Sequence, residues 1–273
     1  MIRQLILIWM LVLPGALCAG PDRVLRDVAY GPNPAQRMDV YLPPAPTKAP
    51  ILVMLHGGGW RFGDKGAPAV WQGKQAHWGA RGYIVVSVNT RLLPEADPLA
   101  QARDLARAVA HVQARAARWG GDAGRLVLMG HSAGAHLAML ISADPKDFAE
   151  TGLRPWRATV ALDSAAVDVA ALMADRPRRL HRAAFGDDPA FWRATSPVAQ
   201  LSRRAVPALV VCSTKRRLSC PAAQSYARAA GAVGARATVL PVALRHGPIN
   251  SEMGRAADYT GAVDRFLRAQ GLP

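Results

Sequence analysis

The chain has 273 residues, of which 51% are hydrophobic and 19% charged, and its formal net charge is +15. This length and apolar content exclude an intrinsically disordered protein, and three cysteines are too few for a disulfide scaffold. Lysine occurs only at positions 48, 65, 74, 146 and 215, so arginine supplies most of the positive charge. The arginines are scattered, with no block of five or more like charges and no interleaved aromatics. We therefore expect a solvated, arginine-rich surface and no nucleic-acid partner.

Residues 1–20 predict a secretory signal peptide. Arg3 is followed by an apolar run at residues 5–13 and by small residues up to Gly20. The run is too short for a membrane span, so no stable membrane insertion is expected after cleavage. A lipoprotein signal at Cys18 fits less well, and an uncleaved anchor is the other alternative. The mature chain, residues 21–273, is expected to be a single exported domain, periplasmic or secreted.

Apolar runs alternate with helical patterns along the mature chain. Residues 24–30 and 37–42 predict a leading pair of strands. Continuous apolar runs, typical of strands buried on both faces of a parallel sheet, then recur at residues 51–55, 83–88, 126–129, 159–162, 209–212 and 238–242. Apolar residues repeat at helical spacing over residues 99–119 and 259–267. This alternation predicts an α/β fold with a mostly parallel central sheet and helices on both faces.

Residues 166–205 interrupt the alternation with several prolines and aromatic residues. We interpret this stretch as a small helical insertion or lid over the carboxyl edge of the sheet. Plain connecting structure is the alternative.

The sequence Gly130-His131-Ser132-Ala133-Gly134 follows the predicted strand at residues 126–129 and begins an alanine-rich helical pattern. This is a G-x-S-x-G motif between a strand and a helix, where a sharp turn exposes the serine hydroxyl. The backbone amide of Ala133 is expected to face a developing oxyanion. Ser132 is therefore the candidate nucleophile.

A second motif, His56-Gly57-Gly58-Gly59-Trp60, follows the predicted strand at residues 51–55. Glycines at this place let bare backbone amides approach a substrate carbonyl, as in the HGGG loop of lipases and esterases. A phosphate-binding loop is the alternative, but the segment lacks the Gly-Lys-Ser/Thr ending. The amides of the three glycines and of Ala133 are predicted to form an oxyanion hole.

A general base is expected after the last strand of such a fold. His246 stands just beyond the predicted strand at residues 238–242 and ahead of the final helical pattern. In chain order and position it fits the imidazole that takes the Ser132 proton.

With these motifs at residues 56–60, 130–134 and 246–250, the chain resembles the α/β-hydrolase carboxylesterases. It is most similar to the bacterial branch grouped with feruloyl esterases and kynurenine formamidases. The resemblance implies the α/β-hydrolase fold, Ser132 as nucleophile and His246 as base. It also implies small esters or amides as substrates and no metal or organic cofactor.

The acid of the triad does not follow the family pattern. The resemblance places a carboxylate in the loop after the strand at residues 209–212, but residues 213–220 contain no Asp or Glu. Arg217 and Leu218 occupy the place where relatives carry the carboxylate. A missing acid lowers turnover by about 10⁴-fold in serine proteases.

Three explanations of the missing acid compete. Asp163, at the end of the preceding predicted strand, supplies the carboxylate from a neighbouring position; or Ser132 and His246 act as a slow dyad; or the protein is a degenerate hydrolase that binds a ligand without cleaving it.

The expected export bears on the redox state of Cys212 and Cys220, which lie eight residues apart and flank a predicted turn. In an oxidising compartment they are candidates for a disulfide. Two buried or free thiols are the alternative, and spacing alone does not decide between them.

The expected function is an exported serine hydrolase that cleaves small carboxylic esters through an acyl-enzyme. Hydrolysis of a small amide or formamide by the same steps is an alternative. A non-catalytic, ligand-binding relative is the alternative from another class, and the missing acid motivates it.

Overall fold

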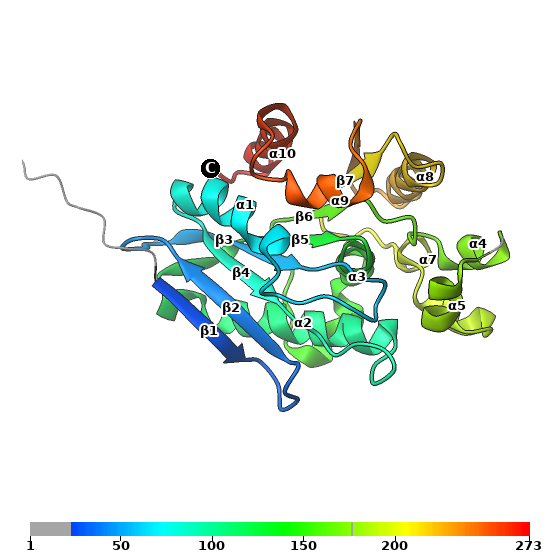
Figure 1. Ribbon diagram of the computed structural model, residues 1–273, viewed down its shortest axis with the longest axis horizontal. Coiled ribbons are helices and arrows are strands. Elements are labelled where there is room, and N and C mark those ends of the chain that lie inside the picture. Colours follow the sequence, from blue (N-terminus) through cyan, green and yellow to red (C-terminus); the bar gives the residue numbers. More distant parts are fainter. Residues whose placement is uncertain (1–22, 176) are drawn as a thin grey trace, which may run out of the picture.

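The computed structural model describes residues 23–175 and 177–273, and its centre is a single β-sheet (Figure 1). The predicted signal peptide at residues 1–20 lies outside the described residues. The strands of the described ranges are β1 (Arg23–Ala29), β2 (Arg37–Leu42), β3 (Ala49–Leu55), β4 (Ile84–Val88), β5 (Gly121–His131), β6 (Ala158–Leu162), β7 (Ala208–Ser213) and β8 (Ala237–Val242). They lie in the order β1-β2-β4-β3-β5-β6-β7-β8.

The sheet is mostly parallel, as the apolar runs predict. Strands β3 to β8 pair in parallel with their neighbours, whereas β1 pairs antiparallel with β2, and β2 pairs antiparallel with β4. Strands β3, β4, β6 and β7 are buried along their whole length, and β8 is a half-exposed edge strand. The mostly parallel sheet expected from the sequence is therefore confirmed.

Helices cover both faces of the sheet (Figure 1). Because side chains alternate along a strand, Leu52 and Met54 of β3 join one apolar cluster, and Ile51, Val53 and Leu55 join the other. The first face carries α1 (Pro68–Trp78), α9 (His246–Ser251) and α10 (Ala257–Ala269). The second carries α2 (Pro98–Arg115), α3 (Ala133–Ala143) and α8 (Ser219–Ala232). Short 3₁₀ helices lie at η1 (Gly79–Arg81), η2 (Ala116–Trp119) and η3 (Pro145–Thr151).

The predicted insertion at residues 166–205 consists of short helices at one end of the molecule (Figure 1). They are α4 (Val169–Ala174), α5 (Arg179–Phe185), α6 (Pro189–Ala194) and α7 (Pro197–Gln200). Phe185 is buried in the apolar cluster formed with α2 and α3. The insertion is therefore anchored to the body of the domain through side-chain packing.

The carboxyl ends of the parallel strands gather at one edge of the sheet, where α/β proteins bind ligands. The glycine loop follows β3, Ser132 follows β5, Asp163 follows β6, and Arg216 follows β7. The sheet order places β3, β5, β6 and β7 side by side. None of the helices in the described ranges has the length and apolar character of a bilayer-spanning segment.

Cys212 and Cys220 form a disulfide with an S–S distance of 2.11 Å. Cys212 lies near the end of β7 and Cys220 in the first turn of α8, so the bond closes a short loop between the strand and the helix.

We expect the double variant Cys212→Ala/Cys220→Ala to lower the free energy of unfolding by about 2.5 kcal/mol, because closing a loop this short restricts the unfolded chain by about that amount. Urea denaturation measures the change. Reduction of the wild type should lower its stability similarly and leave the double variant unaffected. Equal stability of wild type and variant would contradict the prediction.

Candidate active site

Ser132 lies at the sharp turn between β5 and α3. Its backbone has φ 56° and ψ −116°, a conformation that non-glycine residues rarely adopt and that is typical of functional sites. Its amide donates a hydrogen bond to the carbonyl of Leu162 on β6 (2.9 Å). The turn is therefore held at the carboxyl edge of the sheet despite its strained backbone.

The two glycines of the G-x-S-x-G motif allow this turn because they have no side chain. A Cβ atom on Gly130 would lie 2.3 Å from the carbonyl oxygen of Gly134, and a Cβ atom on Gly134 would lie 2.3 Å from that of His56. Both contacts are with backbone, which cannot move aside easily. The motif thus brings the start of α3 against the ends of β3 and β5.

The imidazole of His246 lies between Ser132 and Asp163. Its Nε2 atom is 2.9 Å from Ser132 Oγ, and its Nδ1 atom is 2.6 Å from Asp163 Oδ2. With the proton on Nδ1, the ring donates to the carboxylate, and Nε2 accepts from the serine hydroxyl. A serine, an imidazole and a carboxylate from three distant parts of the chain are therefore joined in one hydrogen-bonded row.

Asp163 follows β6, and its side chain is completely buried. Its Oδ1 atom accepts from Ser219 Oγ and from the Ser213 amide, and Oδ2 accepts from His246 Nδ1 and Arg216 Nη1. Burial raises the pKa of the carboxyl, but the hydrogen bonds from His246 and Ser219 and the charge of Arg216 outweigh it and hold the pKa well below its usual range. Asp163 is therefore a carboxylate around neutral pH, placed as the first of the three explanations requires.

Arg216, and not the adjacent Arg217, lies beside Asp163 and His246. The side chain of Arg217 is 81% exposed, and its ion-pair contact is with Asp175 at 3.9 Å. The chain turns after β7, where the Arg216 amide bonds to the Ser213 carbonyl (3.3 Å), and this turn directs Arg216 toward the site. Arg216 Nη1 lies 2.7 Å from Asp163 Oδ2 and 2.9 Å from His246 Nδ1.

The glycine loop after β3 lies directly against Ser132. A Cβ atom on Gly57 would be 3.0 Å from Ser132 Cβ. Gly58 and Gly59 both have positive φ, 125° and 59°, which glycine adopts at little cost. Ala133 is the first residue of α3. The four residues predicted for the oxyanion hole line the same cavity as Ser132.

Trp60 anchors the glycine loop to two other elements. Its indole N–H donates to Nδ1 of the buried His136 on α3 (3.1 Å), and His136 Nε2 donates to the carbonyl of Thr195 (2.8 Å). The Trp60 ring also packs edge-on against Phe185 of α5, with centroids 4.8 Å apart. The loop, α3 and the helical insertion therefore support one another.

His131 is a supporting residue that sequence analysis did not identify. Its ring lies 4.5 Å from that of His246, and its Nε2 atom donates to the His246 carbonyl (3.0 Å). Burial and the neighbouring charge of His246 lower the pKa of His131 to about 3. His131 is therefore neutral and fixes the His246 backbone without adding a charge.

An open cavity of about 880 Å³ lies above Ser132. Its lining combines Ser132 and His246 with apolar groups from α1 and the insertion, among them Val70, Leu172 and Leu180. The arrangement can hold a small ligand whose carbonyl faces the serine. In the described ranges, no group of three or more His, Cys, Asp or Glu side chains is arranged to hold a metal ion.

We expect Gly134→Ala to destabilise the fold by about 2 to 3 kcal/mol, because its Cβ would meet backbone carbonyls that cannot move aside cheaply. Gly231→Ala in α8 is the matched control: nothing lies within 4 Å of its Cβ, so it should be neutral or stabilise by up to about 1 kcal/mol. Thermal unfolding of both variants tests the difference, and similar melting temperatures would contradict it.

The chain matches the BD-FAE family model over residues 38–229, which is more than half of its length. It is 34% identical over 143 residues to the probable isoprenylcysteine alpha-carbonyl methylesterase ICME of Oryza sativa subsp. japonica; this alignment covers 50% of the chain and 34% of the rice protein. It is 29% identical over 216 residues to esterase LipQ of Mycobacterium tuberculosis, covering 74% of the chain and 51% of LipQ. The chain thus spans about a third to a half of these relatives.

Solved structures show the same fold over nearly the whole chain. A truncated carbohydrate esterase from gut microbiota superposes with a TM-score of 0.77 at 20% identity, covering 91% of this chain and 96% of that protein. Esterase B of Lactobacillus rhamnosis superposes with a TM-score of 0.73 at 18% identity, covering 92% and 85%. The match over residues 38–229 shows that the chain belongs to the BD-FAE family, and its fold is that of the α/β-hydrolase esterases.

Proposed function

We propose that the protein is a serine carboxylesterase that cleaves small esters through an acyl-enzyme. The observation that carries this proposal is the hydrogen-bonded row from Ser132 through His246 to the buried Asp163. The esterase relatives and the family match support the same reaction class. A row of this kind performs acyl transfer on several unrelated folds.

In the first half of the reaction, His246 Nε2 takes the hydroxyl proton as Ser132 Oγ attacks the ester carbonyl. The imidazolium that forms donates a hydrogen bond from Nδ1 to Asp163, and the negative charge of Asp163 stabilises the imidazolium. Nε2 then gives the proton to the departing alkoxide, and the acyl group stays on Ser132. A water molecule repeats these steps in the second half and releases the carboxylic acid.

The amides of Gly57, Gly58, Gly59 and Ala133 supply the hydrogen bonds to the developing oxyanion. Preorganised donors of this kind stabilise the tetrahedral intermediate by about 3 to 4 kcal/mol each in enzymes where one has been removed. The position of the loop against Ser132 and the anchoring of Trp60 support this role, since both fix the loop before substrate arrives.

Esters rather than amides are the proposed substrates, because the named relatives are esterases. The cavity limits the substrate to a small molecule or to the end of a larger one. The position of Asp163 argues against a binder that has lost its acid. The dyad alternative also loses support, because a carboxylate is present at Nδ1.

Export to the periplasm or the medium is part of the proposal. The apolar run at residues 5–13 and the small residues before position 21 support it. The Cys212–Cys220 disulfide is also consistent with an oxidising compartment. N-terminal analysis of the protein secreted by a bacterial host tests cleavage near residue 20.

We expect Ser132→Ala to abolish the hydrolysis of p-nitrophenyl butyrate, leaving a rate at least about 10⁴-fold below wild type, because the nucleophile is lost. The assay follows p-nitrophenol release with purified, folded proteins. Hydrolysis by the wild type that survives unchanged in the variant would contradict the serine mechanism.

We expect Asp163→Asn to lower kcat on the same ester by about 10³- to 10⁴-fold, because a neutral amide no longer fixes the tautomer with the proton on Nδ1 and does not stabilise the imidazolium. Asp175→Asn is the matched control, since Asp175 is an exposed carboxylate twelve residues further along the chain, and its ion pair with Arg217 is long (3.9 Å). A loss no larger than that of Asp175→Asn would show that Asp163 is not the acid.

A further inference from the structure

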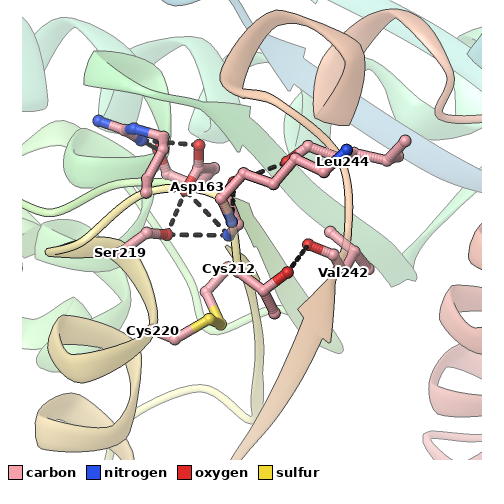
Figure 2. The surroundings of a disulfide bond; sticks show 10 residues. Asp163, Cys212, Ser219, Cys220, Val242 and Leu244 are labelled. Carbon is pink, nitrogen blue, oxygen red and sulfur yellow. Dashed lines mark hydrogen bonds and ion pairs between the residues drawn. A yellow bond between two sulfur atoms is a disulfide. The ribbon is translucent and has the colours of Figure 1, made fainter.

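The segment between the two half-cystines, residues 213–219, forms a loop around the carboxylate of Asp163. Ser213 directly follows Cys212, and its amide donates to Asp163 Oδ1 (3.2 Å). Ser219 directly precedes Cys220, and its hydroxyl donates to the same oxygen. The hydroxyl also accepts from the Ser213 amide (3.0 Å). Figure 2 shows Ser219 and Asp163 beside the disulfide. Both ends of the loop are therefore fixed to one carboxylate oxygen.

Arg216, in the middle of this loop, occupies the other carboxylate oxygen together with His246. Arg216 Nη1 and His246 Nδ1 approach Asp163 Oδ2 at 2.7 and 2.6 Å, and the two nitrogens are 2.9 Å apart. Nη1 also lies 3.3 Å from the Asp163 carbonyl oxygen. The Arg216 side chain is only 31% exposed, so water screens its charge less than at a free surface.

This geometry makes Arg216 and a protonated His246 competitors for one negative charge. Arg216 is always charged, whereas the imidazole gains a charge only when Nε2 takes a proton. A permanent cation next to the ring disfavours that proton, and the carboxylate favours it. The two charges beside the ring therefore act on the imidazole in opposite directions.

Other titratable and charged groups also lie around His246, and all of them except Arg217 are common to the proteins compared below. Arg178 and His181 of the insertion line the same cavity, and burial lowers the pKa of Lys74 to about 7, within the pH range of the test. His131, which packs against the ring, is held neutral with its pKa lowered to about 3. On the α1 side, Lys74 Nζ bonds to the Asn250 carbonyl and side-chain oxygen (both 2.6 Å) in α9. Tyr259 of α10 donates to the Ile249 carbonyl (3.0 Å). Lys74 and Tyr259 therefore bond to residues 249 and 250 of α9 and not to the His246 ring.

We propose that Arg216 is a positioning residue that holds Asp163 in place, and that its charge opposes protonation of His246. The site therefore works at lower pH than a Ser-His-Asp row without this cation. The inference rests on the proposed serine mechanism. In the family that this chain resembles, the loop after β7 carries the acid. In this chain that loop carries Arg216, which is paired with Asp163, the residue after β6.

The test measures how fast a fluorophosphonate probe labels Ser132 between pH 4.5 and 9, which reports on nucleophile and base without knowledge of the substrate. Four proteins are compared: wild type, Arg216→Gln, Arg216→Lys and Arg217→Gln. Arg217 is the matched control, because it is the next residue in the loop, has the same charge and is exposed. Thermal unfolding of each protein shows that it is folded.

In Arg216→Gln we expect the acid limb of the labelling rate to move to higher pH by about one unit or more, because removal of a cation beside the ring favours the protonated imidazole. Arg216→Lys keeps the charge and should retain most of the wild-type limb even if its maximal rate falls. Arg217→Gln should match the wild type.

A uniform fall in rate at all pH values for Arg216→Gln, with an unmoved limb, would reduce Arg216 to a structural residue and overturn the inference while leaving the serine mechanism intact. An equal shift in Arg217→Gln would also overturn it, because general surface charge would then be the cause. Folded wild type that is not labelled at Ser132 at any pH would overturn the proposed function and this inference together.

Discussion

The carboxylate of Asp163 is the point on which the candidate site depends. It is a fully buried charge, and such a charge is tolerated only when hydrogen bonds and opposite charges compensate for lost hydration. Four donors provide this compensation: the Ser213 amide, the Ser219 hydroxyl, the Arg216 guanidinium and the His246 imidazole. Three of them belong to one short loop closed by a disulfide. The proposed acid Asp163, the proposed base His246 and the disulfide therefore form a single unit.

The parallel sheet brings this unit to the nucleophile. Because β5, β6 and β7 are neighbours, the residues that follow them meet at one edge. The strained turn at Ser132 is bonded to Leu162, the last residue of β6, and Asp163 comes next in the chain. The residue that fixes the turn at Ser132 and the residue that bonds to the His246 imidazole are therefore adjacent in the chain.

Much of the fold could be predicted from the sequence, because apolar runs and helical spacing are local signals. Ser132 and His246, the proposed nucleophile and base, could also be named from the sequence, because the glycines around Ser132 and the position of His246 after the last strand are local signals. The role of Asp163 could only be offered as one of three explanations. It lies 83 residues from His246, and their contact depends on how β6, β7 and α9 are placed, which no local pattern encodes.

The roles of Arg216 and His131 could not be predicted from the sequence for the same reason. Whether Arg216 or Arg217 lies beside the imidazole depends on the conformation of the turn after β7. A shift of that turn by one residue would exchange the two side chains. His131 is the variable position between Gly130 and Ser132 in the motif, and only the packing of β5 against α9 shows that it bonds to the His246 backbone. The sequence reads Cys212-Ser213 at one end of the loop and Ser219-Cys220 at the other. This symmetry was a hint that the disulfide brings both serines to one partner, which is the Asp163 carboxylate.

The most direct measurement of the central interaction is the proton NMR spectrum of the ¹⁵N-histidine-labelled protein. A proton held between His246 Nδ1 and the Asp163 carboxylate should give a far-downfield resonance with one-bond coupling to nitrogen. This resonance should be present in the wild type and absent from folded Asp163→Asn. If the folded wild type shows no such resonance as pH is lowered until the imidazole is protonated, or if the resonance persists in Asp163→Asn, the imidazole is not oriented by Asp163.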